Sequence, residues 1–162
     1  MSLATPLTRR NCLRHLGLAT TLCTPALVWG TPGSLPLAVS LSDEATRASA
    51  QAQALIVMVS LAGCPFCHTV RQHHLLPLQA QGQAVVQVDM RDNRPLHNFQ
   101  GQTLSHDAQT RQWGIKVAPT LLFLGPQGQE LAERLTGGYL PDFYGSYLDG
   151  RLNQARQALK RL

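Results

Sequence analysis

The sequence predicts an α/β domain in which a central mixed sheet is flanked by helices on both faces. Residues 55–60 form an apolar, β-branched run, typical of a strand that is buried on both faces. A Gly-Pro-Gln-Gly turn at 125–128 joins two further strands as a hairpin. Helical patterns separate the other strands. The resulting order, α-β-α-β-α-β-β-α, combines a β-α-β half with a ββ-α half, which is why we expect a mixed sheet.

The first half of the domain contains the strand that leads to the chemistry. Ser40-Leu-Ser-Asp43 is a capping sequence for a helix over residues 44–53, which are rich in Ala and Gln. The strand at 55–60 then leads into a helix over 65–80, which Pro77 is expected to bend or end. A second strand is predicted at 84–90.

The second half begins with residues 91–105, which are polar and are predicted to be irregular, followed by a short helix around 106–113. Strands are expected at 120–124 and 129–135. Pro141 opens the last helix, in which apolar residues recur at helical spacing: Tyr144, Leu148, Leu152, Ala155 and Leu159.

The length of 162 residues suits one domain with a short appendage. Residues 1–30 have a basic start and a moderately apolar stretch without acids, which predicts an export signal, with an uncleaved N-terminal anchor as the alternative. The segment 8–14 resembles a twin-arginine signal, and a general secretory signal explains it equally well. Cleavage is expected between Gly30 and Ala38, 31–41 is expected to be a linker, and 42–162 is the predicted domain. We therefore expect a periplasmic location.

The charge pattern does not indicate a nucleic-acid partner. The formal net charge is +5, but three arginines of the first fourteen residues account for most of it. The remaining eleven basic residues are spread among nine acidic ones without forming a stripe. We expect a monomer that does not bind nucleic acid.

The segment Cys64-Pro65-Phe66-Cys67 follows the buried strand directly. Pro65 is favourable as the first helical residue, which makes Cys64 the N-cap. The N–H groups and the dipole of the helix then favour thiolate over thiol. The alternative, an inert structural disulfide, gains little stability because the loop is so small. A zinc site is disfavoured because no second ligand pair has suitable spacing, so we predict a reactive dithiol and no metal.

A second interpretation comes from His68. Cys64-Pro-Phe-Cys67-His68 also satisfies the Cys-x-x-Cys-His attachment signature of c-type haem. His68 would then be the proximal ligand, with Met58 or Met90 as a distal one. The strands and the hairpin that surround the motif argue against this interpretation, because a small helical cytochrome lacks them.

Two blocks of sequence resemble the thioredoxin superfamily. One is the strand with Cys64-Pro65-Phe66-Cys67, and the other is residues 113–128, which contain Ala-Pro119-Thr before a strand and a Gly-containing turn. The resemblance covers about residues 42–160. Within the superfamily, the chain is similar to small periplasmic thioredoxin-like proteins of the type associated with sulfur oxidation or cytochrome c maturation.

The resemblance implies that Pro119 is cis and lies beside the sulfur of Cys64. It also implies that the Ala118 backbone is free to pair with an extended substrate, in a groove to which Pro65 and Phe66 contribute. The sequence departs from the family pattern at three places. Met58 replaces a buried acid, His68 replaces the common lysine, and residues 91–105 form a longer connection.

Together these features predict an exported thiol–disulfide oxidoreductase that reduces or exchanges disulfides in partner proteins, with reduction favoured. Cys64 would attack, Cys67 would resolve the mixed disulfide, and a protonated His68 would lower the pKa of a neighbouring thiol. The dithiol would be the only redox group, with no further cofactor and with a membrane electron donor as a candidate partner. The alternative from another class is a redox-inactive binding or scaffold protein, which the methionine at position 58 favours.

Overall fold

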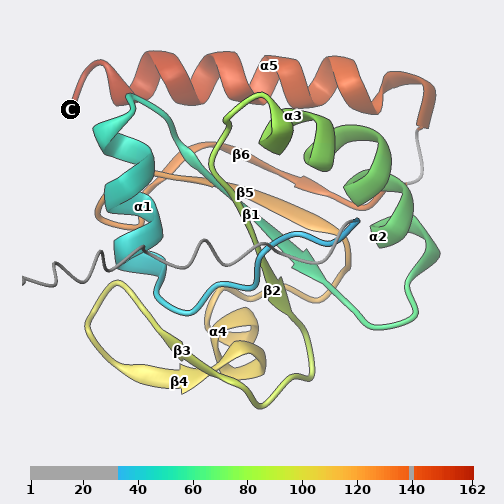
Figure 1. Ribbon diagram of the computed structural model, residues 1–162, viewed down its shortest axis with the longest axis vertical. Helices are drawn as coiled ribbons and strands as arrows, with labels where there is room; N and C mark the ends of the chain where they lie inside the picture. The colour runs from blue at the N-terminus through green and yellow to red at the C-terminus, as the bar shows by residue number, and fades with distance from the viewer. Residues whose placement is uncertain (1–32, 139–140) are drawn as a thin grey trace, which may run out of the picture.

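The computed structural model describes residues 33–138 and 141–162 (Figure 1). The predicted export signal at 1–30 lies outside these residues. The helices are α1 (Leu41–Ala50), α2 (Pro65–Val70), η1 (Arg71–Leu75), α3 (Leu76–Ala80), α4 (His106–Gln112) and α5 (Pro141–Leu159). The strands are β1 (Leu55–Ser60), β2 (Val85–Asp89), β3 (Pro95–His97), β4 (Thr103–Ser105), β5 (Thr120–Leu124) and β6 (Glu130–Thr136). Within the described part of the chain, no helix combines the length and hydropathy needed to cross a membrane.

The main sheet has the strand order β2-β1-β5-β6. β1 pairs in parallel with β2 and antiparallel with β5, and β5 pairs antiparallel with β6 across the predicted hairpin. Figure 1 shows α5 and the α2–α3 helix on one side of the sheet, and α4 with β3 and β4 on the other. This arrangement confirms the predicted α/β fold with a mixed sheet.

The apolar run of β1 is explained by two separate cores, one on each face of the sheet. Ile56 and Met58 contribute to the core beneath α2 and α5. Leu55, Val57 and Val59 alternate with them and contribute to the core beneath α1 and α4. Every residue of β1 is buried, as the sequence predicted for a central strand.

Pro77 does not end the helix that follows the cysteines. The helix continues to Ala80 as α3, and the turn before the proline widens into the π-helix η1. There the N–H of Leu76 donates to the carbonyl of Arg71, five residues back. Because proline lacks an N–H and its ring crowds the preceding turn, a wider turn lets the helix pass it without a break.

Residues 91–105 are not irregular throughout, which corrects the prediction. They contain the antiparallel pair β3–β4, with Leu96 fully buried. The connecting turn is held by Asn98, whose side-chain oxygen accepts from the N–H groups of Gln100 at 3.0 Å and Gln102 at 2.9 Å. The prediction missed this hairpin because a buried amide, rather than an apolar pattern, organises it.

The described part of the predicted linker, residues 33–40, packs onto the domain. Leu35 and Ala38 are buried, and the Ala38 N–H donates to the carbonyl of Gln87 at 2.9 Å. This pairing covers the outer edge of β2. Ser40 then caps α1 by accepting from the N–H of Asp43 at 3.3 Å. The packed domain therefore includes residues before 42.

Candidate active site

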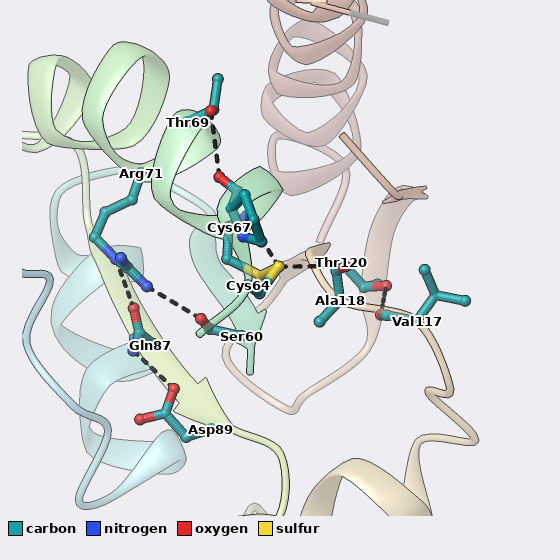
Figure 2. Close-up of a disulfide and its surroundings, with 11 residues drawn as sticks. Ser60, Cys64, Cys67, Thr69, Arg71, Gln87, Asp89, Val117, Ala118 and Thr120 are labelled. Atoms are coloured by element: carbon teal, nitrogen blue, oxygen red, sulfur yellow. Dashed lines mark hydrogen bonds between the residues drawn. A yellow bond between two sulfur atoms is a disulfide. The ribbon is translucent and has the colours of Figure 1, made fainter. Parts of the chain in front are cut away.

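Cys64 lies between the end of β1 and the first turn of α2. It is the N-cap residue of α2, and Pro65 occupies the first helical turn, where its missing N–H costs nothing. The Cys64 sulfur accepts from the N–H of Cys67 at 3.1 Å, and the two cysteines form a disulfide (Figure 2). The helix N-terminus therefore presents N–H dipoles to this sulfur, which stabilise negative charge on it when the disulfide is reduced.

The two cysteines differ in accessibility. Cys64 is partly exposed, whereas Cys67 is 1% exposed and packs in the core with Met58 and Val70. An incoming sulfur can therefore reach Cys64 and not Cys67. A two-step exchange needs this asymmetry, because one sulfur must react with the partner disulfide and the other must then attack the mixed disulfide from within the protein.

One flank of Cys64 is formed by residues more than fifty positions away in sequence. The peptide bond between Ala118 and Pro119 is cis. The Cys64 sulfur lies 3.8 Å from the Ala118 carbonyl oxygen (Figure 2). Phe66 and Val117 are about half exposed, at 52% and 47%. We call Phe66, Val117, Ala118 and Pro119 the apolar side of the site.

Gly138 holds the apolar side together by having no side chain. A Cβ atom at this position would lie 3.3 Å from the Phe66 Cβ, 3.3 Å from the Pro119 Cγ and 3.2 Å from a methyl group of Val70. Phe66 and Pro119 therefore meet across the glycine backbone. The neighbouring Gly137 N–H donates to the Pro119 carbonyl at 2.8 Å, which fixes the loop before β5 to the end of β6.

The other flank of Cys64 opens into a polar cavity of about 780 Å³. Its lining includes Cys64 and His68 and a chain of hydrogen-bonded side chains. We call this chain, formed by Ser60, Arg71, Gln87, Asp89 and Arg94, the polar side of the site. Its members come from β1, η1, β2 and the loop after β2.

Arg71 is the centre of the polar side. Its Nε donates to the Gln87 side-chain oxygen at 3.0 Å, and its Nη2 donates to the Ser60 hydroxyl at 3.0 Å (Figure 2). The Gln87 amide in turn donates to an Asp89 carboxylate oxygen at 2.7 Å. Arg71 was not predicted from the sequence, although it lies four residues after Cys67, a spacing that puts both residues on one helix face and could have indicated it.

Arg94 and His106 make contacts that fix the end of β2 and the loop after it. Arg94 contacts the carboxylates of both Asp89 and Asp92. Hydrogen bonds from the Arg94 side chain and backbone lower the pKa of Asp92 to about 2. The Nδ1 of His106 accepts from the Asp89 N–H at 3.1 Å, and burial lowers the pKa of His106.

The other predicted residues are not brought together into a ligand site. His68 is exposed on α2, whereas Met58 is fully buried within β1. Among residues 33–138 and 141–162, no group of three or more His, Cys, Asp or Glu side chains could hold a metal ion.

Comparison with known proteins gives a family match. The profile of the thioredoxin-like domain matches residues 41–149. Similar solved structures include a DsbH oxidoreductase, with 18% identity over 83% of this chain and 92% of that one and a TM-score of 0.48. Another is the periplasmic thioredoxin SoxS from Paracoccus pantotrophus, with 20% identity over 64% of this chain and 99% of that one and a TM-score of 0.43. A thioredoxin-fold protein from Helicobacter pylori has 13% identity over 68% of this chain and 84% of that one, with a TM-score of 0.45. No curated protein matches the sequence.

Proposed function

This chain belongs to the thioredoxin-like domain family, and we propose that it is an exported thiol–disulfide oxidoreductase that acts through Cys64 and Cys67. The observation that carries the proposal is the asymmetry of the disulfide. Cys64 is accessible at a helix start, and Cys67 is buried directly behind it. A structural disulfide has no need of this arrangement.

The reaction begins with the reduced protein. The Cys64 thiolate attacks one sulfur of a substrate disulfide, which breaks that disulfide and releases one substrate thiolate, to be protonated by water. Cys67 then loses its proton and attacks the Cys64 sulfur. This step breaks the mixed disulfide, releases the second substrate thiol and leaves Cys64–Cys67 oxidised. Two electrons pass from protein to substrate, and a dithiol donor must return them.

The apolar side offers the substrate a place to lie. The Ala118 carbonyl is 3.8 Å from the attacking sulfur, and Phe66 and Val117 expose apolar surface beside it. An extended substrate segment can pair with backbone there while its side chains contact Phe66. We propose protein disulfides as substrates on this basis, with reduction as the direction. Since the periplasm is oxidising, the electrons would have to come across the membrane.

The export part of the proposal rests on residues 1–30, with their basic start and acid-free apolar stretch. It is tested separately from the chemistry. We expect the full chain, produced in a Gram-negative host, to appear in the periplasmic fraction, and replacement of Arg9 and Arg10 by lysine to retain it in the cytoplasm if the twin-arginine route is used. Recovery of the unaltered chain from the cytoplasm alone would contradict export.

Trapping with Cys67→Ala tests the proposed chemistry. Without the resolving cysteine, the reaction stops at the mixed disulfide, so we expect covalent adducts that thiol reductants release. Cys64→Ser is the matched control and should give none. The purified protein should also reduce insulin, which Cys64→Ser should not. If the unaltered protein does not turn over and Cys67→Ala traps nothing, the chain is a binding or scaffold protein instead.

His68 is the remaining proposed contributor. It lines the cavity next to Cys64, and a protonated imidazole there would stabilise the thiolate. We expect His68→Ala to raise the pKa of the Cys64 thiol, measured by thiolate absorbance in the ultraviolet. An unchanged thiol pKa would remove His68 from the mechanism.

A further inference from the structure

We propose that the polar side recognises a carboxylate that the substrate carries close to its disulfide, and that Arg71 is the residue that binds it. This inference rests on the proposed function, because it names a feature of the substrate of the same dithiol. Its basis is the cavity beside Cys64, which lies on the flank away from Ala118.

The cavity is placed and sized for part of a substrate. Its volume of about 780 Å³ is within the range of about 300–1,000 Å³ that is usual for ligand pockets. Gly63, Cys64 and Pro65 are among the residues that line it. A substrate whose sulfur is bonded to Cys64 can therefore place its neighbouring groups in the cavity.

Arg71 is held in place without being neutralised. Its two partners, the Ser60 hydroxyl and the Gln87 amide oxygen, are both uncharged. A guanidinium has five N–H donors, and two bonds leave donors free to point into the cavity. No carboxylate among the described residues forms an ion pair with Arg71. Arg94, in contrast, is paired with Asp89 and Asp92.

The charges around the cavity favour an anion. Three arginines line it, Arg71, Arg91 and Arg94, against the two carboxylates of Asp89 and Asp92. Arg94 with its two aspartates carries one net negative charge. Among the described residues neither Arg71 nor Arg91 forms an ion pair, so these two arginines leave the cavity with one positive charge, and Arg71 is the one held by hydrogen bonds to neutral side chains. Guanidinium groups bind carboxylates through two parallel hydrogen bonds. Disulfides derived from amino acids carry carboxylates at chain ends or on acidic side chains, so a carboxylate is the anion that a disulfide substrate can supply.

The test compares three small disulfides that differ in charge. Dithiodipropionate carries two carboxylates, hydroxyethyl disulfide is neutral, and cystamine carries two ammonium groups. The reduced protein is mixed with each, and the rate of Cys64–Cys67 oxidation is followed by mass spectrometry after the remaining thiols are alkylated. The rate for each disulfide is divided by the rate at which the same disulfide oxidises a free model thiol. We expect this relative rate to be highest for dithiodipropionate and lowest for cystamine. The preference should shrink at high salt, because the charges are partly exposed.

The measured quantity is the rate of Cys64–Cys67 oxidation by dithiodipropionate divided by the rate with hydroxyethyl disulfide. We call this quotient the ratio of anionic to neutral rates. A ratio cancels any change in the reactivity of the Cys64 thiolate itself. We expect Arg71→Gln to lower the ratio about fivefold or more, the effect of losing a charge-assisted contact near solvent. Arg71→Lys keeps the positive charge but cannot form two parallel hydrogen bonds to a carboxylate. Its ratio should therefore lie between those of Arg71→Gln and the unaltered protein. Arg47→Gln removes an exposed charge on α1, outside the cavity, and should leave the ratio unchanged.

Two additional substrates separate the sources of the carboxylate. One is oxidised glutathione, and the other is a pair of disulfide-linked peptides that differ only by Asp or Asn beside the cysteine. A preference for oxidised glutathione, or for the Asp peptide over the Asn peptide, that is lost in Arg71→Gln supports the proposal. The substrate that shows the preference identifies where the recognised carboxylate comes from. Equal ratios for the unaltered protein and Arg71→Gln in all arms would overturn it. If even hydroxyethyl disulfide fails to react, the proposed function itself is wrong, and that outcome is distinct from a lost preference.

Discussion

The apolar side and the polar side meet at the same sulfur but are constructed differently. The apolar side uses the backbone of residues 117–119 and two half-exposed apolar side chains. The polar side uses charged and amide side chains from four elements, joined by hydrogen bonds. Backbone contacts accept many sequences, whereas fixed charges discriminate between substrates. We infer that the apolar side holds substrates of many kinds and that the polar side selects among them.

The largest effect should come from filling the gap in the apolar side. Gly138→Val places a branched side chain where even a Cβ lies 3.2–3.3 Å from Val70, Phe66 and Pro119. Val70, Phe66 or the Pro119 loop must then shift, and each of them lies next to one of the two cysteines in sequence or in space. We expect the rate of insulin reduction to fall about tenfold or more, since displacements near 1 Å at a reacting centre can have effects of that size.

The matched control is Gly150→Val. Gly150 also lies outside the tight turns, in α5, and a Cβ there meets no atom within 4 Å. Both variants are compared by circular dichroism and thermal unfolding before the assays. If Gly138→Val reduces insulin as fast as Gly150→Val does, the apolar side does not position the substrate.

The polar side is tested next by Arg94→Gln. This change removes the cation between Asp89 and Asp92 and makes the cavity more negative by one charge. The ratio of anionic to neutral disulfide rates should fall about threefold, less than for Arg71→Gln, because an exposed, already paired charge contributes less. A rise in the ratio would contradict the assigned charge balance.

The same variant has a second measurable consequence. The pKa of Asp92, about 2 in the presence of Arg94, should return towards its ordinary value of 3.8. Carbon-13 NMR of the carboxyl groups measures this shift directly. Because the pKa in the folded protein is lowered, the Arg94–Asp92 contact stabilises the fold above pH 3.8 and loses its contribution as the pH falls through about 2. The Arg94→Gln variant should lack that part of the acid transition.

A smaller effect is expected from Phe66→Ser. This exposed ring can contact a protein substrate, whereas hydroxyethyl disulfide is too small to use it. We expect insulin reduction to slow about threefold, the effect of losing part of an apolar contact, with a smaller change for hydroxyethyl disulfide. Val39→Ser removes another exposed apolar side chain, away from the cysteines, and serves as control. Equal slowing with both substrates would place the effect on the thiol rather than on substrate contact.

The difference between the two sides also explains what could be predicted from sequence. The apolar side consists of two continuous blocks, and each has a local signature: a strand followed by Cys-Pro-Phe-Cys, and Ala-Pro-Thr followed by a strand. Local patterns of this kind also predicted β1 and β5 with their observed bounds, because both strands are apolar apart from Ser60 at the end of β1 and Thr120 at the start of β5. In these segments, the residues that the packing requires are also the residues that form a recognisable local sequence pattern.

The polar side has no such signature. Ser60, Arg71 and Gln87 are ordinary polar residues until the parallel pairing of β1 and β2 brings Ser60 and Gln87 near the same helix face. The hairpin in residues 91–105 escaped prediction for the same reason, since Asn98 and a single buried leucine organise it. Properties that depend on side-chain hydrogen bonds across elements are set by tertiary packing, which periodicity does not report.

The smallest predicted effect concerns His106, which supports the polar side from behind. Its Nδ1 accepts from the Asp89 N–H, and the ring also hydrogen-bonds the Ala38 backbone, so it links β2, α4 and the segment before α1. Burial is the largest influence on its pKa and lowers it from 6.5, against the opposing effect of Asp92. The folded state therefore favours the neutral ring. This contribution to stability is complete above pH 6.5 and is lost as the pH falls through the lowered pKa.

We expect the midpoint of thermal unfolding to decrease on acidification below pH 6.5, and His106→Asn to make that decrease smaller, because the lowered pKa of His106 no longer contributes. Asparagine can still accept the Asp89 N–H but does not titrate. His97→Asn, at an exposed position in β3, is the comparison variant. If His106→Asn and the unaltered protein lose stability in parallel over this pH range, the buried ring is not protonated on acidification. The link between α4 and the polar side would then be insensitive to pH.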